Sequence, residues 1–249
     1  MLPFVLILAG IGADRLLLSG RWAALDPLRR RWRDWRPRVL AYIRSAPGTY
    51  AYLFVLLITS WILQTSSSRI ANALLQERST NLHHLATDPL RVLFSSAFWV
   101  GSLTDWLAWV ALFSIFVAPV ERWIGTGRTA LVFFIGHVGA TLITAGGLWV
   151  ALHSDLVESS VVNARDVGAS YGFAAVAAVL TYRLSGRRRL LYAAGLVAFA
   201  GVSLALNHNF TYWGHLIALA IGFACYPIVR RFVPRRDVRY APAPQTADA

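Results

Sequence analysis

Cysteine and lysine are the residues that this chain most lacks. Its 249 residues include one cysteine, Cys225, and all 24 basic residues are arginine. A single cysteine excludes an internal disulfide framework, and without a cluster of cysteine and histidine it provides no structural zinc site. Arginine without lysine, together with abundant alanine, is associated with a GC-rich bacterial genome.

Charged residues are also scarce, at 14% of the chain against 57% hydrophobic residues. A soluble domain carries about a quarter charged residues, so this composition excludes an ordinary cytosolic enzyme. The formal charge of +12 could suggest nucleic-acid binding, yet most arginines stand in short runs that flank apolar blocks. That placement is typical of membrane-topology signals, and we expect no nucleic-acid partner.

Apolar blocks recur along the chain. A transmembrane helix needs about 20 mostly apolar residues, and six blocks qualify: 48–65, 92–118, 129–152, 168–184, 190–206 and 213–229. Six spans place both termini on one side of the membrane. Nineteen arginines fall on that side and four on the other, so the positive-inside rule makes both termini cytoplasmic. The sequence therefore predicts an all-α, six-helix protein of the bacterial plasma membrane.

The six blocks divide the chain into three parts. Residues 1–47 are predicted to be a cytoplasmic or interfacial segment, 48–229 a membrane domain, and 230–249 a basic, disordered tail. Residues 2–13 are too few for a span, which favours an interfacial or re-entrant helix. Residues 21–44 mix arginine with tryptophan and are predicted to form a helix that lies on the anionic inner leaflet.

A serine begins the fourth apolar block within a GxSxG pattern, Gly168-Ala169-Ser170-Tyr171-Gly172. In soluble hydrolases this pattern is a nucleophile elbow between a strand and a helix, but nothing here predicts a parallel sheet. Gly168 and Gly172 also form a GxxxG pair. Close helix packing is therefore an alternative interpretation of the same residues.

The sixth block carries a second small face and a histidine. Gly214, Ala218 and Gly222 recur every four residues, so another helix backbone can approach closely. His215 lies beside this face, and a hydrogen-bonded interfacial histidine is the alternative interpretation. Because the fourth and sixth helices both enter from the outer side, Ser170 and His215 are predicted to lie at the same depth. An imidazole within about 3 Å can take the serine proton, which makes the pair candidate nucleophile and general base.

In this order, the motifs resemble those of the rhomboid intramembrane proteases, and more narrowly those of divergent actinobacterial rhomboid-like proteins. The resemblance covers about residues 48–229 and rests first on Gly168-Ala-Ser170 and Gly214-His215. The family also has a Trp-Arg pair in the first loop and Glu-Arg-x-x-Gly after the second helix. Leu90-Arg91 and Glu121-Arg122-Trp-Ile-Gly125 resemble these, with leucine in place of the tryptophan.

The resemblance implies a six-helix fold with Ser170 as nucleophile and His215 as general base and acid. It implies no cofactor and no metal, and it gives structural roles to Arg91, Glu121, Arg122, Gly125, Gly172, Gly214, Ala218 and Gly222.

The chain departs from the family pattern where oxyanion donors are expected. In the family, the second helix supplies a histidine and an asparagine, and these positions are Asp105 and Trp109 here. A neutral Asp105 could still donate a hydrogen bond; alternatively, it pairs with an arginine or backbone amides at the outer rim. Tyr171 replaces the glycine after the serine, while the backbone at Gly168 and Ala169 remains an oxyanion candidate. Losing one donor costs about 100- to 1,000-fold in rate.

The other histidines give no metal site. His83 and His84 are predicted to be a solvated or interfacial pair, and His137 is predicted to make an interhelical hydrogen bond. His208 could join His215 at a metal, but no HExxH pattern or nearby group of acids supports this.

Two functions remain. The first is an intramembrane serine protease that cleaves membrane-spanning substrates near the outer surface. The alternative is a catalytically silent rhomboid pseudoprotease that binds client membrane helices. Both imply a membrane-protein partner and the lipid bilayer. A small-molecule transporter has less support, because the sequence shows no inverted repeat.

Overall fold

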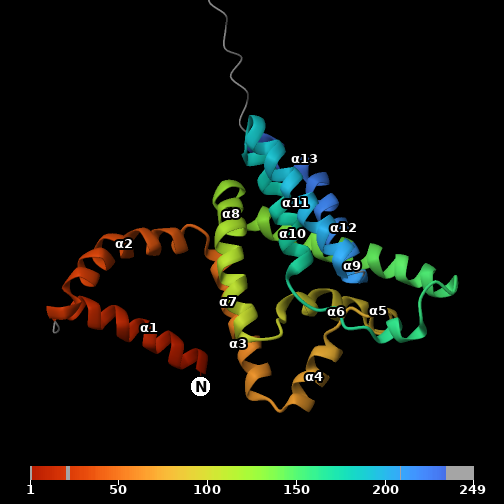
Figure 1. The fold of residues 1–249 in the computed structure, drawn as a ribbon, viewed down its shortest axis with the longest axis horizontal. Helices are drawn as coiled ribbons and strands as arrows, with labels where there is room; N and C mark the ends of the chain where they lie inside the picture. The colour runs from red at the N-terminus through yellow and green to blue at the C-terminus, as the bar shows by residue number, and fades with distance from the viewer. Residues whose placement is uncertain (1, 21–22, 208, 234–249) are drawn as a thin grey trace, which may run out of the picture.

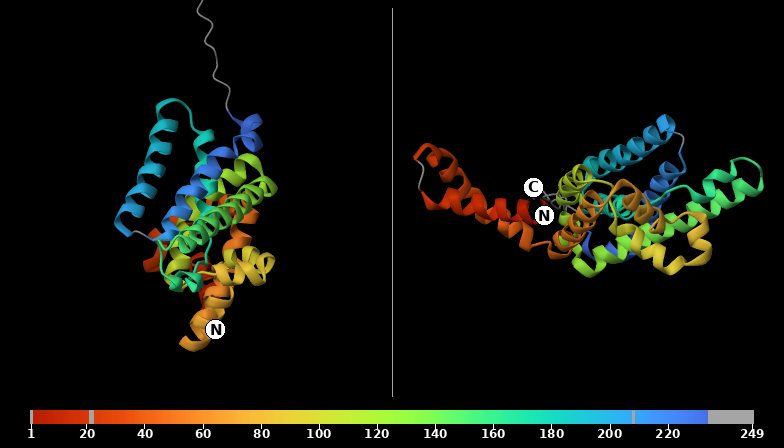
Figure 2. Two further views of the ribbon diagram at one scale, coloured as in Figure 1. Left: turned by 90° about the vertical axis from the view of Figure 1, so that its right-hand side faces the viewer. Right: turned by 90° about the horizontal axis from the view of Figure 1, so that it is seen from below.

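The computed structural model describes residues 2–20, 23–207 and 209–233. Every regular element in this part of the chain is a helix, and it contains no strand. Figure 1 shows a bundle of helices with an N-terminal hairpin at one side, and the right-hand view of Figure 2 shows the hairpin extending away from the bundle. The predicted all-α class is confirmed.

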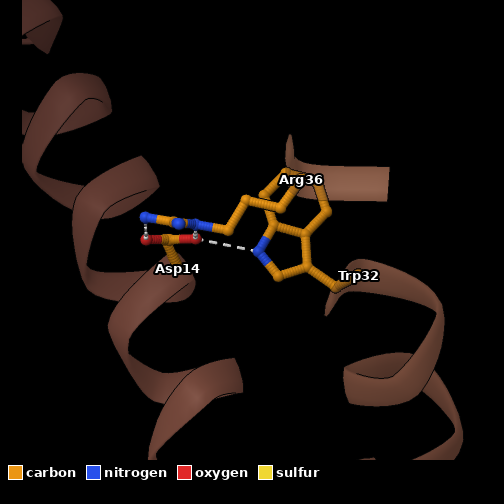
Figure 3. A network of polar contacts seen from close by, with 3 residues as sticks. All are labelled: Asp14, Trp32 and Arg36. Atoms are coloured by element: carbon orange, nitrogen blue, oxygen red, sulfur yellow. Dashed lines mark hydrogen bonds and ion pairs between the residues drawn. The ribbon is translucent and has the colours of Figure 1, made fainter. Parts of the chain in front are cut away.

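The hairpin consists of α1 (Leu2–Ser19) and α2 (Asp26–Arg44), with a 3-10 turn at Ala23–Leu25 before α2. Asp14 of α1 accepts hydrogen bonds from Trp32 and Arg36 of α2 at 2.8 and 2.7 Å (Figure 3). A second Arg36 nitrogen lies 3.0 Å from the other Asp14 oxygen, so the ion pair is bidentate. The hydrogen bond from Arg36, followed by that from Trp32, lowers the pKa of Asp14. With this charge paired, α1 continues beyond the apolar segment that ends at residue 13.

The connection that follows the first long helix consists mainly of short helices. The helix α3 (Pro47–Thr65) agrees with the first predicted block. The connection contains α4 (Ser68–Glu77), α5 (Leu82–Thr87), α6 (Pro89–Ser95) and a 3-10 turn at Ser96–Phe98. These short helices gather at the lower end of the bundle in Figure 1.

The second span begins later than the sequence indicated. The helix α7 (Leu103–Leu112) passes through a π-helical turn (Phe113–Val117) into α8 (Ala118–Ile124). The predicted start at residue 92 is wrong, because residues 92–98 belong to α6 and the 3-10 turn. The Ser102 hydroxyl accepts a hydrogen bond from the Asp105 N–H at 3.1 Å, which caps α7. Gly125, with φ of 86°, separates α8 from α9 (Thr126–His153).

The remaining helices form the C-terminal half of the bundle. After a 3-10 turn at Ser159–Asn163 come α10 (Ser170–Leu180), a 3-10 turn at Thr181–Arg183, and α11 (Gly186–Asn207). They are followed by α12 (Phe210–Ala224), α13 (Tyr226–Val229) and a 3-10 turn at Arg230–Phe232. The helix α11 is mostly exposed and lies at the edge of the bundle (Figure 2, left).

By length and composition, four helices among the described residues could cross a membrane: Pro47–Thr65, Leu103–Ile124, Thr126–His153 and Gly186–Asn207. The pair Phe210–Ala224 and Tyr226–Phe232, bent by 43°, makes a fifth if it is one span. With 11 residues, α10 is about 16 Å long and cannot alone cross a hydrocarbon core of about 30 Å. It is almost entirely buried, so protein rather than lipid surrounds its backbone. The chain is a multi-pass membrane protein, and six spans remain a prediction.

Glycine residues bring α9, α10 and α12 into direct contact. A Cβ on Gly136 of α9 would lie 2.1 Å from the Ala175 Cβ of α10. On Gly222 of α12 it would lie 2.3 Å from the Ala175 carbonyl oxygen, and on Gly172 of α10 it would lie 2.6 Å from the Phe133 ring. The small residues on these helices therefore form their packing surfaces.

Candidate functional site

Ser170 is the first residue of α10 and is half-buried. The chain reaches it through Gly168, whose φ of 131° disfavours a residue with a side chain. The Gly168 N–H donates to the Ser96 carbonyl oxygen at 3.0 Å, which ties this segment to the first connection. The first helical hydrogen bond runs from Phe173 N–H to the Ala169 carbonyl at 2.9 Å. The N–H groups of Ser170 and the next two residues therefore have no intrahelical acceptor.

Ser170 and His215 lie at the same end of the interface between α10 and α12. Ala174 and Leu219 belong to one buried cluster that joins these helices. Ser170 precedes Ala174 by four residues, and His215 precedes Leu219 by four. Because residues four apart share a helix face, both candidates continue the faces that pack together.

Tyr171 lies in the same interface, next to this pair. Its ring is buried and packs edge-on against His215, with the ring centroids 5.3 Å apart. A Cβ on Gly214 would lie 2.3 Å from Cζ of Tyr171, so only glycine admits the ring here. In the sequence Tyr171 was only a bulky replacement for glycine, and its contact with the imidazole was not expected.

The structure brings Ser170 and His215 to one interface without joining them directly. Among the described residues, no hydrogen bond links the Ser170 hydroxyl to the His215 ring, and Tyr171 makes the contact between the helices at this level. Both candidate side chains are only partly buried. Their polar atoms are therefore not sealed inside the protein.

Asp166, in the connection before α10, was not recognised from the sequence as a site residue. Thr80 donates its hydroxyl to the Asp166 carbonyl at 3.0 Å and to a carboxylate oxygen at 3.3 Å, and the Asp166 N–H donates to the Ser79 hydroxyl at 2.8 Å. The Tyr171 hydroxyl lies beside the carboxyl group without a hydrogen bond of good geometry. Burial raises the pKa of Asp166 to about 6. The sequence signal was an acidic residue four positions before Ser170.

Among the described residues, neither side-chain oxyanion candidate has a hydrogen bond or ring contact with Ser170 or His215. Asp105 is exposed in the first turn of α7, and its carboxylate lies over Gly101. In the part of the chain that the structure describes, this carboxylate has no ion pair, so both its role as a neutral donor and its pairing with an arginine or backbone amides at the outer rim stay predictions. Trp109 packs edge-on against Phe113 and Phe173, with centroids 5.7 and 5.5 Å apart. Phe173 belongs to α10, so Trp109 supports that helix from the side of α7.

Glu121 connects the first two long helices. It is buried and accepts hydrogen bonds from the Gly48 and Thr49 N–H groups at 2.8 and 2.7 Å. The hydroxyls of Thr49 and Thr126 each donate to it at 2.6 Å. The carboxylate thereby satisfies the free backbone donors at the start of α3.

The arginines of the family-like motifs have surface positions. Arg122 is exposed, with its guanidinium carbon 4.9 Å from the centroid of the Tyr42 ring. Arg91 is also exposed and pairs with Asp88 at 2.6 Å. Neither side chain is a contact of the Ser170 and His215 pair among the described residues. Their contacts with Tyr42 and Asp88 are consistent with structural roles for both arginines.

The remaining histidines are placed as follows. Nε2 of His137 lies 3.0 Å from the Ser96 hydroxyl, so the expected hydrogen bond joins α9 to the 3-10 turn at Ser96–Phe98. The rings of His83 and His84 are 5.5 Å apart. His208 lies outside the described residues, and within them no group of three or more histidine, cysteine or acidic side chains could hold a metal.

A family comparison agrees with these features. The model of the family described as "Rhomboid-like protein" matches residues 41–234. No curated protein and no solved structure matches the chain.

Proposed function

The chain belongs to the rhomboid-like protein family, and on this premise we propose that it is an intramembrane serine protease with Ser170 and His215 as its catalytic dyad. The observation that carries the proposal is the position of these residues on the packed faces of α10 and α12, one turn beyond Ala174 and Leu219. A binder of membrane helices has no evident need for a serine and a histidine at that one level.

In the proposed reaction, the Ser170 hydroxyl attacks the scissile carbonyl carbon while His215 takes its proton. The backbone N–H groups at the start of α10 have no helical acceptor and would stabilise the oxyanion. His215 then gives the proton to the leaving amine as the C–N bond breaks. A water molecule hydrolyses the acyl-enzyme, with His215 again acting as base.

The proposed substrates are membrane-spanning segments cut near the outer surface. A stable helix hides its carbonyl groups in internal hydrogen bonds, so segments that unwind easily should be preferred. Because the dyad consists of a serine and a histidine, the proposed reaction uses no cofactor or metal.

The topology proposed for this function has six spans within residues 48–229 of a bacterial plasma membrane. In it, the fourth span is the predicted block 168–184, which α10 enters as its central helix and the 3-10 turn at Thr181–Arg183 extends. Both termini are cytoplasmic. Residues 1–47 would then face the inner leaflet, where the arginines and tryptophans of α2 contact anionic lipid. Residues 230–249 would form the cytoplasmic tail.

A second candidate function, a rhomboid pseudoprotease that binds client helices, is favoured by the surroundings of the dyad. Tyr171 fills space between α10 and α12, and Asp105 and Trp109 replace the family's donors on the second helix. These features reduce the support for a developing oxyanion without altering the helix-packing surfaces.

Labelling with a fluorophosphonate probe tests the choice. The full chain in detergent micelles should be labelled in the wild type and in Ser203→Ala, a control in which a serine of α11 is removed. Ser170→Ala and His215→Ala should lose the label and should not cleave a model transmembrane substrate, whereas wild type and Ser203→Ala should cleave it. Folded wild type without label from about pH 5 to about pH 9 would establish the pseudoprotease instead.

A further inference from the structure

Three arginines line one groove at the end of the bundle where the end of α8 meets the 3-10 turn after α13. The groove has a volume of about 420 Å³ and lies between the start of α9 and the α13 region. Its lining consists of Arg128, Leu131, Pro227, Ile228, Arg230 and Arg231. No part of the proposed proteolytic site belongs to it.

The groove exists because the chain bends after α12. The helix pair on either side of Cys225 is bent by 43°, with Pro227 in the first turn of α13. The indole N–H of Trp123 at the end of α8 donates to the Phe232 carbonyl at 3.0 Å. This bond holds the turn after α13 against the junction of α8 and α9.

Two of the three arginines in the groove lie over one aromatic ring. The guanidinium carbons of Arg128 and Arg231 lie 5.1 and 5.3 Å from the centroid of the Phe232 ring. Arg128 also donates to the Ile124 carbonyl at 3.2 Å. The ion pairs among the described residues involve Arg29, Arg36 and Arg91, so no acidic side chain in that part of the chain neutralises the groove. Like charges held together in this way favour a shared anion.

The apolar lining indicates what kind of anion would fit. Leu131, Pro227 and Ile228 provide a surface that a free inorganic ion would not use. Leu131 belongs to one of the membrane-spanning helices and is 50% exposed. Guanidinium groups bind phosphate through paired N–H donors, and basic pockets between helices at a membrane surface suit lipid headgroups.

We infer that this groove binds one anionic phospholipid, with its phosphate on Arg128, Arg230 and Arg231 and an acyl chain along Leu131 and Ile228. This differs from general attraction to an anionic leaflet, because it assigns a defined site whose lining residues come from α9, α13 and the turn after α13. It does not depend on whether Ser170 is catalytic.

Native mass spectrometry of the full chain, titrated with phosphatidylglycerol or phosphatidylcholine, tests the site. Arg230→Gln with Arg231→Gln should weaken phosphatidylglycerol binding by roughly fivefold for each arginine removed. The control is Arg187→Gln with Arg188→Gln, which removes the same charge from exposed positions at the start of α11. Its binding should change less than twofold. Equal weakening by both pairs would show general surface attraction and overturn the site.

Two further measurements test the site without removing an arginine. One changes the apolar part of the groove, and the other uses the wild-type protein with a competing anion. Leu131→Trp, at a half-exposed position, should block phosphatidylglycerol while all arginines remain. Unchanged binding would refute the placement of the acyl chain. Inorganic phosphate in excess should fail to displace the lipid; displacement at concentrations similar to those of phosphatidylglycerol would mean that the groove takes a free anion.

Discussion

Tyr171 of α10 packs edge-on against His215 of α12, with 5.3 Å between the ring centroids. The residue directly after the candidate nucleophile therefore fixes one side of the candidate base. The same ring fills the space over Gly214, where any side chain would collide with it. In a protease, this contact would orient the imidazole of His215. In a pseudoprotease, the Tyr171 ring would occupy space between α10 and α12 that a substrate would otherwise need.

Removing the Tyr171 ring should be costly, whereas removing its hydroxyl should not. Tyr171→Ala deletes a buried aromatic ring and should lower the free energy of unfolding by about 3–5 kcal/mol. Tyr171→Phe keeps the ring and removes a hydroxyl without a well-formed hydrogen bond, so a change within about 1 kcal/mol is expected. Denaturant titration in micelles measures both. An alanine variant as stable as wild type would show that the ring is not a packing element.

Glycine positions along the helices should differ sharply in their tolerance of alanine. Gly222→Ala would push a Cβ to 2.3 Å from the Ala175 carbonyl oxygen, so α10 and α12 must separate. The expected cost is about 1–3 kcal/mol in unfolding free energy. Gly195→Ala in α11 is the matched control, because nothing lies within 4 Å of its added Cβ. It should be neutral or slightly stabilising, and equal losses at both positions would contradict the observed packing.

Much of the architecture could be predicted from the sequence because it follows from composition. Long apolar blocks can only be helices in a membrane, and this gave the all-α class and the bounds of α3 within a residue or two. Small residues at four-residue spacing gave the faces on which α10 and α12 pack. Each of these features is a local property that a sequence displays directly.

The remainder depends on how distant segments meet. Hydropathy could not separate α6 from the second span, since residues 92–98 are apolar but end in a turn before the Ser102 cap. Nor could it show that α10 is short, because a helix surrounded by protein needs no lipid-spanning length. The contacts of Tyr171 with His215 and of Asp166 with Thr80 join helices and loops far apart in sequence. Motif spacing does not contain this information.

The proposed orientation can be measured with single cysteines. In a Cys225→Ala background, Glu158→Cys should react with an impermeant thiol reagent on intact cells, and Ser185→Cys should react only after lysis. Both native residues are exposed, and position 185 avoids the positive φ of 56° at Gly186. The reverse pattern would place Ser170 and His215 near the cytoplasmic surface.

Asp166 should make stability depend on pH. Burial raises its pKa from an ordinary value of 3.8 to about 6 in the folded protein, so the folded state binds a proton more tightly than the unfolded state does. Its stabilising contribution is therefore complete below about pH 4 and is lost as pH rises through about 6. Between about pH 4.5 and about pH 7.5, wild type should lose about 2 kcal/mol of unfolding free energy from this group.

Asp166→Asn separates this contribution from other titrations, because the amide stays neutral and can accept the Thr80 hydrogen bond at every pH. The variant should be more stable than wild type near pH 7.5 and should lack this part of the pH dependence. Glu158→Gln, which removes an exposed carboxylate from the same connection, is the control and should follow the wild-type profile. Parallel profiles for Asp166→Asn and wild type would mean that the carboxyl group of this half-buried residue is solvated in the folded protein.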